Sequence, residues 1–180
     1  MLKGSRVILK PPERKYIDFF LKWMSDVETT QYLKMYRPLT REMEEEWFDN
    51  LKNREDLFLF SIFISLENGN ERIIGNCSIG VDWKNRVGTS GIVIGEKDCL
   101  GKGYGTEAMK LLIKYGFNTL NLNRIQLETY EFNIRAFKSY KKAGFIEEGK
   151  RRQAIYVNGK YHDAYMLGIL KSEWQDKKEK

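Results

Sequence analysis

Three glycines separated by single residues lie near the middle of the chain, in the segment CLGKGYGTEA at 99–108. Glycine lets the backbone approach a ligand closely and enter turns that other residues resist. Where such a loop opens a helix, its N–H groups and the positive end of the helix dipole attract phosphate. The segment therefore indicates either a phosphate-binding loop or a glycine-rich turn that only reverses the chain.

The spacing of the glycines excludes one kind of phosphate site and disfavours another. A magnesium-nucleotide loop needs Ser or Thr directly after Gly-Lys, and Gly103 stands there instead. A dinucleotide fingerprint needs a third glycine where this chain has Thr106, and a preceding parallel strand. A cradle for pyrophosphate without a metal ion remains, with Lys102 adding positive charge.

Other reactive side chains are few. His162 is the one histidine, and the two cysteines, Cys77 and Cys99, do not form a Cys-x-x-Cys pair. A zinc site and a triad with a histidine base are therefore not expected. We interpret His162 as an ordinary strand residue. Cys99 precedes the glycines and suggests an acyl-cysteine intermediate, but no histidine accompanies it to serve as its base.

Length and composition indicate one globular domain spanning residues 1–180. Of these residues 42% are hydrophobic and 31% are charged, which is ordinary for a folded protein. The net charge of +6 favours anionic partners, including nucleotide cofactors and nucleic acids. No segment approaches the roughly 18 apolar residues of a membrane span, and the N-terminus does not resemble a signal peptide. We expect a cytoplasmic protein with reduced thiols and no membrane partner.

Residue periodicity predicts the elements that position the glycine loop. A strand at 5–10 precedes helices at 14–24, 26–33 and 42–50, the last capped by Thr40. The following segments are rich in Ile, Val and Phe, and short turns connect them. These predicted strands of an antiparallel meander cover residues 57–66, 72–81 and 89–95.

The second half alternates helices and strands. A helix at 104–119, with a buried stripe of Ala108, Leu111, Leu112 and Tyr115, leads to a strand at 124–130. A helix then begins at Asn133 and ends at Gly144, and strands 145–157 and 160–170 form a terminal hairpin. The crossover from 89 to 130 predicts a parallel pair. The fold class is α/β (α+β): a mixed, mostly antiparallel sheet of about seven strands with helices on both faces.

Several segments resemble the GNAT superfamily of acetyl-CoA-dependent N-acetyltransferases, and within it the RimJ/RimL and spermidine acetyltransferase branch. The resemblance covers most of the chain. It rests on 6–33, LGKGYGTEA at 100–108, NIRAFKSYKKAGF at 133–145 and VNGKYHDAYMLGIL at 157–170. The family loop reads Arg/Gln-x-x-Gly-x-Gly/Ala, and Leu100 departs from it at the first position.

The resemblance implies which residues bind acetyl-CoA, with no metal. The backbone of Ile92, Val93 and Ile94 would pair with the pantetheine arm, and Asn133 would bond to it near the thiol. Tyr140 would protonate the leaving thiolate. The residues implied to hold the pyrophosphate are Leu100, Gly101, Lys102, Gly103, Tyr104, Gly105 and Thr106.

The implied reaction is direct attack of a primary amine on the thioester in a ternary complex. The general base stays open, because Thr89 stands where many relatives have Glu. Asp82, Glu128 or a water chain can replace it, or the amine can arrive deprotonated.

The acceptor also stays open among a protein N-terminal amine, a polyamine-like amine and an aminoglycoside. Acidic side chains at 28, 42 and 44–46 either attract a cationic amine or are simply solvated. The aromatic Tyr32, Tyr36 and Trp47 belong either to an acceptor slot or to the core.

Family habit implies a ribosomal-protein partner and a homodimer. One alternative function is a CoA sensor without turnover, suggested by Thr89. Another is a basic ribosome- or RNA-associated module, suggested by the net charge and by GKRRQ at 149–153. Direct nucleic-acid binding is not expected, since aromatic residues do not interleave with the basic ones.

Overall fold

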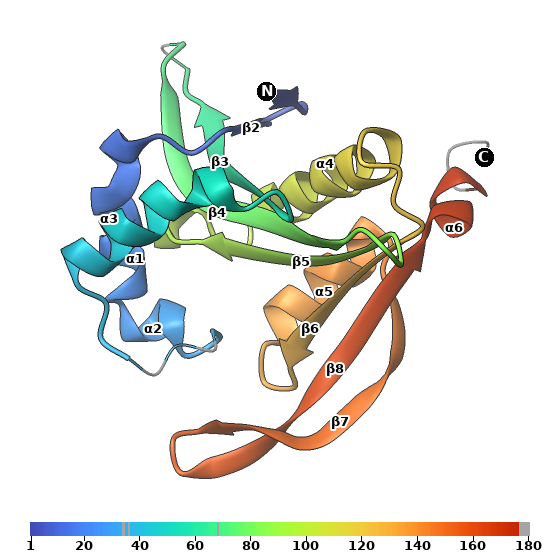
Figure 1. The fold of residues 1–180 in the computed structure, drawn as a ribbon. Coiled ribbons are helices and arrows are strands. Elements are labelled where there is room, and N and C mark those ends of the chain that lie inside the picture. The colour runs from blue at the N-terminus through green and yellow to red at the C-terminus, as the bar shows by residue number, and fades with distance from the viewer. Residues whose placement is uncertain (34, 36, 68, 177–180) are drawn as a thin grey trace.

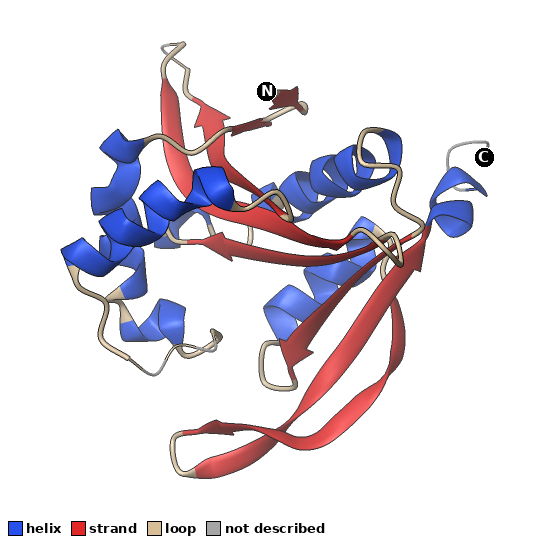
Figure 2. Cartoon of the chain, viewed as in Figure 1, coloured by secondary structure: helices blue, strands red, loops and turns tan. Residues whose placement is uncertain are grey.

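The computed structural model describes residues 1–33, 35, 37–67 and 69–176. Figures 1 and 2 show a curved sheet with helices packed against it and a long hairpin extending from one end. The strands are β1 Leu2–Lys3, β2 Val7–Lys10, β3 Leu57–Ser65, β4 Glu71–Asp82, β5 Val87–Ile94, β6 Arg124–Tyr130, β7 Ile146–Val157 and β8 Lys160–Leu170. The helices are α1 Ile17–Met24, α2 Val27–Thr30, α3 Arg41–Asn50, α4 Tyr104–Asn118, α5 Ile134–Ala143 and α6 Lys171–Asp176.

The strands form one sheet in the order β1-β2-β3-β4-β5-β6-β8-β7. Neighbours are antiparallel except β5 and β6, which are parallel and joined through α4. The predicted mixed sheet with one strand–helix–strand crossover is therefore confirmed. The sequence predicted about seven strands, and the additional one is β1, whose two residues are too few for a periodic pattern.

Helices cover both faces of the sheet, as predicted, because successive side chains of a strand point to opposite faces. In β2, Val7 and Leu9 join the main core under α4, whereas Ile8 joins a second cluster with Phe20 and Trp23 of α1. Helix α5 contributes Tyr140 and Ala143 to the main core, on the α4 side.

Two helices differ from the sequence prediction. Helix α2 covers Val27–Thr30 instead of 26–33. In α4, the predicted Leu111 and Tyr115 are only half-buried, while Met109 and Ile113 are fully buried. The buried arc of α4 is wider than a single stripe because the helix packs on the sheet and also on neighbouring helices, with Phe117 5.4 Å from the ring of Trp174.

The two parallel strands separate soon after they meet. Pairing between β5 and β6 runs from Val87↔Arg124 to Thr89↔Gln126, yet β5 continues to Ile94 and stays paired with β4 to its end. Figure 1 shows β5 and β6 diverging toward their carboxyl ends. In an antiparallel pair, every second residue directs its N–H and C=O away from its partner. From residue 90 to 94, β5 therefore offers backbone groups to the space that opens beside it.

Helix α1 fixes the carboxyl end of β5 from the face of the sheet opposite to α4. The ring of Trp23 lies against Gly95, where an added Cβ would come within 2.1 Å of the ring. The Trp23 Nε1 donates to the Glu96 carboxylate at 2.8 Å, and Arg72 donates to the same carboxylate at 2.6 Å. Burial favours the neutral form of Glu96, but these donors and Lys22 outweigh it and lower its pKa.

We expect Gly95→Ala to destabilise the fold by about 1–3 kcal/mol, the usual cost of forcing an extra methyl group into a packed site. Gly80→Ala is the matched control in β4, because its Cβ would meet no atom nearer than 3.9 Å, so its effect should stay within about 0.5 kcal/mol. Urea unfolding monitored by tryptophan fluorescence measures both. Equal stability of the two variants would show that the contact between Trp23 and Gly95 is not a tight one.

Candidate active site

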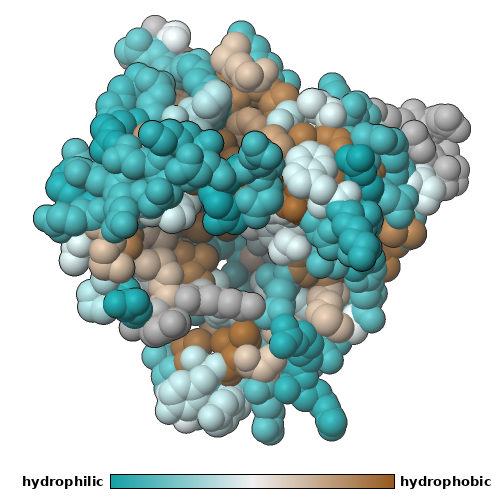
Figure 3. Space-filling view, in the orientation of Figure 1, coloured by the Kyte–Doolittle hydropathy of each residue, from teal (hydrophilic) through white to brown (hydrophobic). Residues whose placement is uncertain are grey.

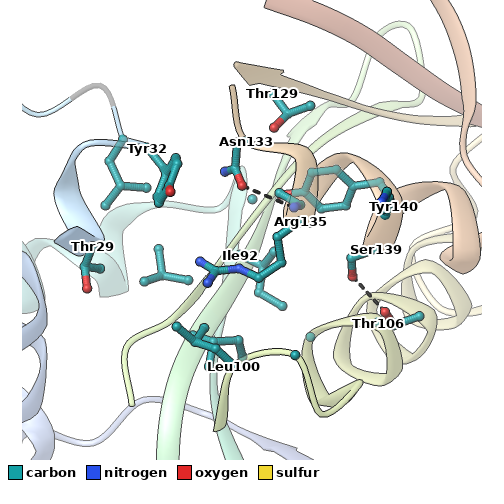
Figure 4. Close-up of a pocket in the computed structure, with 18 of the residues that line it drawn as sticks. Thr29, Tyr32, Ile92, Leu100, Thr106, Thr129, Asn133, Arg135, Ser139 and Tyr140 are labelled. Carbon is teal, nitrogen blue, oxygen red and sulfur yellow. Dashed lines mark hydrogen bonds between the residues drawn. The ribbon is translucent and has the colours of Figure 1, made fainter. Parts of the chain in front are cut away.

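A cleft of about 620 Å³ opens where β5 and β6 separate. Its walls come from β5, the glycine loop, β6, α5 and the segment from Glu28 to Leu33. Figure 4 shows side chains from these elements converging on the cleft, with Tyr32 on one side and Ser139 and Thr106 on the other. The surface is mainly hydrophilic in Figure 3, and apolar residues line a hollow near the middle of the view.

The glycine loop presents backbone N–H groups at the cleft. Gly101 and Gly103 have φ of +74° and +87°, a left-handed conformation that glycine adopts without strain. The first helical hydrogen bond of α4 runs from the Glu107 N–H to the Gly103 carbonyl at 3.0 Å. The N–H groups of residues 104–106 therefore have no partner within the helix, as at any helix start. Loop and helix together form an anion-binding end.

Helix α5 places an amide and a phenol in the cleft. Asn133 caps the helix, since its Oδ1 accepts from the Ala136 N–H at 3.2 Å. Tyr140 lies deeper, 7% exposed, and burial raises the pKa of its hydroxyl to about 12. The phenol is therefore protonated at every physiological pH and can act only as a donor or a neutral acceptor.

A pair of hydroxyls joins the two helices that border the cleft. Thr106 Oγ1 in the first turn of α4 lies 2.7 Å from Ser139 Oγ in α5, and both residues line the cleft (Figure 4). This contact fixes the N-terminal turn of α4 relative to α5. This hydrogen bond between the two helices therefore helps to fix the distance between the loop amides and Tyr140.

Three cations of α5 line the same cleft. Arg135, Lys138 and Lys142 are exposed and lie at helical spacing along one side of α5. The Arg135 guanidinium lies 5.8 Å from the centre of the Tyr32 ring, on the opposite wall. The sequence prediction missed these residues, although their spacing of three and four in the segment 135–142 was a readable sign of one helix face.

Among the described residues that line the cleft, two are carboxylates, and each has a cationic partner. Glu28 lies 2.9 Å from the Lys97 ammonium, and Glu128 lies 2.9 Å from the Arg151 guanidinium. Asp82, the other carboxylate considered as a general base, does not belong to the described lining, and neither does Thr89, which stands where many relatives have Glu. Asp82 instead accepts from Asn85 in the turn after β4, and Thr89 Oγ1 accepts from Gln126 at 3.4 Å.

The cleft brings together ten of the twelve residues that the resemblance implied for binding acetyl-CoA and for catalysis. They are Ile92, Val93, Ile94, Leu100, Gly101, Gly103, Gly105, Thr106, Asn133 and Tyr140. Lys102 and Tyr104, although in the same loop, are outside the lining. Both contact Arg6 instead, through the Lys102 carbonyl and the Tyr104 ring.

Some of the residues considered for the acceptor site line the cleft and others do not. Glu28 and Tyr32 line the cleft, whereas Trp47 is 40% exposed and does not. The glutamates of α3 also lie outside the lining, and Glu44 among them is buried. Tyr36 falls outside the described residues. The acidic helix is therefore not a wall of this cleft within the described part of the chain.

Neither Cys99 nor His162 is placed to act as a catalytic residue. Cys99 lines the cleft but is 4% exposed, and burial, then the Asp98 charge, raise the pKa of its thiol. A raised pKa disfavours the nucleophilic thiolate. His162 lies in β8 with its Nδ1 3.2 Å from Glu131. Within the described residues, no three His, Cys, Asp or Glu side chains gather in a group that would hold a metal ion.

The family model described as Acetyltransferase (GNAT) domain matches residues 6–146. The chain belongs to the GNAT family. An uncharacterised N-acetyltransferase, p20 of Bacillus licheniformis, is 31% identical over 96% of this chain and 97% of its own length. The protein is therefore an N-acetyltransferase by family, and GNAT acetyltransferases use acetyl-CoA.

Other similar proteins match over shorter segments. YdaF of Bacillus subtilis, provisionally named a ribosomal N-acetyltransferase, is 39% identical over 54% of this chain and 53% of its own length. The spermidine N(1)-acetyltransferase of Vibrio cholerae is 33% identical over 44% of this chain and 46% of its own. These names agree with the branch predicted from the sequence.

The fold has a solved counterpart. The crystal structure of spermidine N-acetyltransferase from Vibrio cholerae in complex with CoA and spermine superposes with a TM-score of 0.86 and covers 96% of this chain and 99% of its own. At 23% identity this likeness confirms the GNAT fold. In the described part of this chain, the helices are all too short or too polar to span a membrane.

Proposed function

We propose that this GNAT protein transfers an acetyl group from acetyl-CoA directly to a primary amine bound in the cleft between β5 and β6. The observation that carries the proposal is the separation of these strands beside a loop rich in backbone N–H groups. The exposed edge of β5 suits an extended arm with amide groups, and the loop suits a pyrophosphate. The residues present therefore fit acetyl-CoA as a substrate.

The proposed contacts follow from position. The backbone of Ile92–Ile94 pairs with the pantetheine amides as an added strand would. The amides of the segment 101–106 hold the pyrophosphate, and Leu100 contributes only backbone there. The cations Arg135, Lys138 and Lys142 attract the phosphates. The amide of Asn133 contacts the arm near the thiol, while Lys102 and Tyr104 support the loop from outside the cleft.

During transfer, the amine nitrogen bonds to the thioester carbon and the carbon–sulfur bond breaks to release CoA as a thiolate. The proton that the nitrogen loses passes to the thiolate or to solvent water. A backbone N–H of β5 stabilises the charge that develops on the carbonyl oxygen. Tyr140 donates a hydrogen bond to the thiolate. Full proton transfer from a group with pKa near 12 to a thiolate whose conjugate acid has a pKa of about 8.5 is uphill, so the hydrogen bond itself is the main contribution.

The pairing of both cleft carboxylates bears on the choice of acceptor. Glu28 and Glu128 each already face a cation, Lys97 and Arg151, so the attraction of either carboxylate for a second positive charge is reduced. Such a site favours an amine that is already partly neutral. At pH 7.5 about a quarter of an α-amine with a pKa of about 8 is neutral, against about one in a thousand for an alkylamine with a pKa of about 10.4.

We therefore propose the α-amine of a peptide or protein N-terminus as the preferred acceptor, with a polyamine as the second candidate. The names of the spermidine-acetylating relatives favour the second. A ribosomal protein as the peptide substrate, a homodimer and a cytoplasmic location remain predictions.

The acceptor preference is tested by following free thiol with acetyl-CoA and three acceptor classes: short peptides with free N-termini, the same peptides N-blocked with an internal lysine, and spermidine. We expect kcat/KM for free N-termini to exceed that for spermidine at pH 7.5 by about tenfold or more, because the neutral fraction is larger. Log(kcat/KM) should rise with pH and level off near pH 8.

The possible results separate the hypotheses. A preference for spermidine of the same size would overturn the α-amine assignment and leave acetyl transfer intact. Binding of CoA without turnover of any acceptor would favour the sensor function. Absence of CoA binding in calorimetry would reject acetyl transfer and favour the ribosome-associated module, for which binding of ribosomal RNA is then the positive test.

Tyr140→Phe keeps the ring and removes the donor. We expect kcat to fall on the order of 100-fold, the usual loss for one hydrogen bond to a developing anion, with KM for acetyl-CoA within about twofold. Phe137→Leu is the control, since it changes an aromatic residue of α5 that packs on Tyr165 outside the lining. An unchanged kcat in Tyr140→Phe would remove the tyrosine from the reaction.

A further inference from the structure

Arg6, directly before β2, contacts the glycine loop but does not belong to the described lining of the cleft. Its Nη1 donates to the Lys102 carbonyl at 3.1 Å, and its guanidinium lies 5.0 Å from the centre of the Tyr104 ring. A Cβ added at Gly103 would come within 3.1 Å of its Nη2. Arg6 therefore touches three consecutive residues of the loop while about one hundred residues distant in sequence.

Glu107, in the first turn of α4, holds Arg6 in place. Its carboxylate accepts from the Arg6 N–H at 2.8 Å, the Val7 N–H at 3.1 Å and the Ser5 hydroxyl at 3.1 Å, and it forms an ion pair with the Arg6 Nε at 3.3 Å. Burial favours the neutral form of Glu107, but these N–H donors outweigh it and lower its pKa. The carboxylate therefore stays charged and joins the start of β2 to the start of α4.

The loop needs such support for two reasons. Gly101 and Gly103 have more conformational freedom in an unrestrained chain than other residues, so an unbraced loop loses more entropy when it closes on a ligand. At Leu100, moreover, no side chain can donate a hydrogen bond. A loop that binds through backbone N–H groups alone depends on those groups already pointing the same way.

We propose that Arg6 and Glu107 form a clamp that preorganises the glycine loop for the pyrophosphate of acetyl-CoA. Arg6 is a positioning residue, because it does not belong to the described lining of the cleft. The guanidinium fork reaches the Lys102 carbonyl and Glu107 at once, which a lysine ammonium on a flexible stem does not reproduce. This inference rests on the proposed use of acetyl-CoA.

If Arg6 and Glu107 act as a clamp, removing Arg6 should weaken only the binding of the pyrophosphate end of acetyl-CoA. Arg6→Met should raise the KM for acetyl-CoA by about tenfold, since hydrogen bonds from charged groups contribute this much or more. The kcat should stay within about twofold. With S-acetylpantetheine as the acetyl donor, which lacks the pyrophosphate, kcat/KM should be unchanged. Arg6→Lys should resemble Arg6→Met.

Arg14→Met is the matched control. Arg14 is as exposed as Arg6 and also combines an ion pair, to Asp49, with a position over an aromatic ring, that of Phe48. These two partners belong to α3 and not to the loop, so the loss of Arg14 should leave the KM for both donors unchanged. Thermal unfolding of all variants identifies any global loss of structure, and Glu107→Gln tests the other half of the clamp if Arg6→Met does not fold.

The outcomes are distinct. An equal fall in kcat/KM with acetyl-CoA and with S-acetylpantetheine would show that the Arg6 contacts maintain the fold in general. That result would overturn the clamp. So would an unchanged KM for acetyl-CoA in folded Arg6→Met. If the wild-type protein used neither donor, the proposed function would fail before the clamp was tested in turnover, and direct titration with CoA and with pantetheine would still compare the two ends of the ligand.

Discussion

The separation of β5 from β6 after three residue pairs is the constraint on which the site depends. A fully paired β5 would bury its backbone groups in the sheet and leave no edge for a ligand. Because unpaired backbone groups away from water are costly, a strand that opens in this way needs an occupant or solvent. In the proposed function, an extended, amide-containing substrate joins the sheet at this opening.

The surrounding elements keep the opening in one shape. Trp23 and Glu96 fix the end of β5 from one face, while α4 and α5 fix the loop from the other through the Thr106–Ser139 pair. The clamp of Arg6 and Glu107 adds a third attachment behind the loop. The amide groups that face the cleft are thus held by side chains that do not themselves line it, apart from the two hydroxyls.

The sequence predicted most of this arrangement because local signals were strong. Alternating apolar residues, the Asn-Gly turn and the capping residues Thr40 and Asn133 located nearly every element, and the glycine spacing located the loop. Contacts between distant segments could not be read in this way. Arg6 and Glu107 meet only because β2 and α4 are neighbours in the fold. The ion pairs that neutralise Glu28 and Glu128 likewise join separate elements, and the sequence alone left these carboxylates as candidate groups for the acceptor or the base.

Amide hydrogen exchange with and without CoA tests the central claim most directly. Backbone binding along the opened strand and the glycine loop predicts that saturating CoA slows exchange in two segments, 91–94 and 101–106, more than elsewhere in the chain. Peptides from the far end of the β7–β8 hairpin serve as the internal reference. Binding of CoA that left exchange in both segments unchanged would contradict the account, because the ligand would then be held somewhere other than the backbone edge of β5 and the loop.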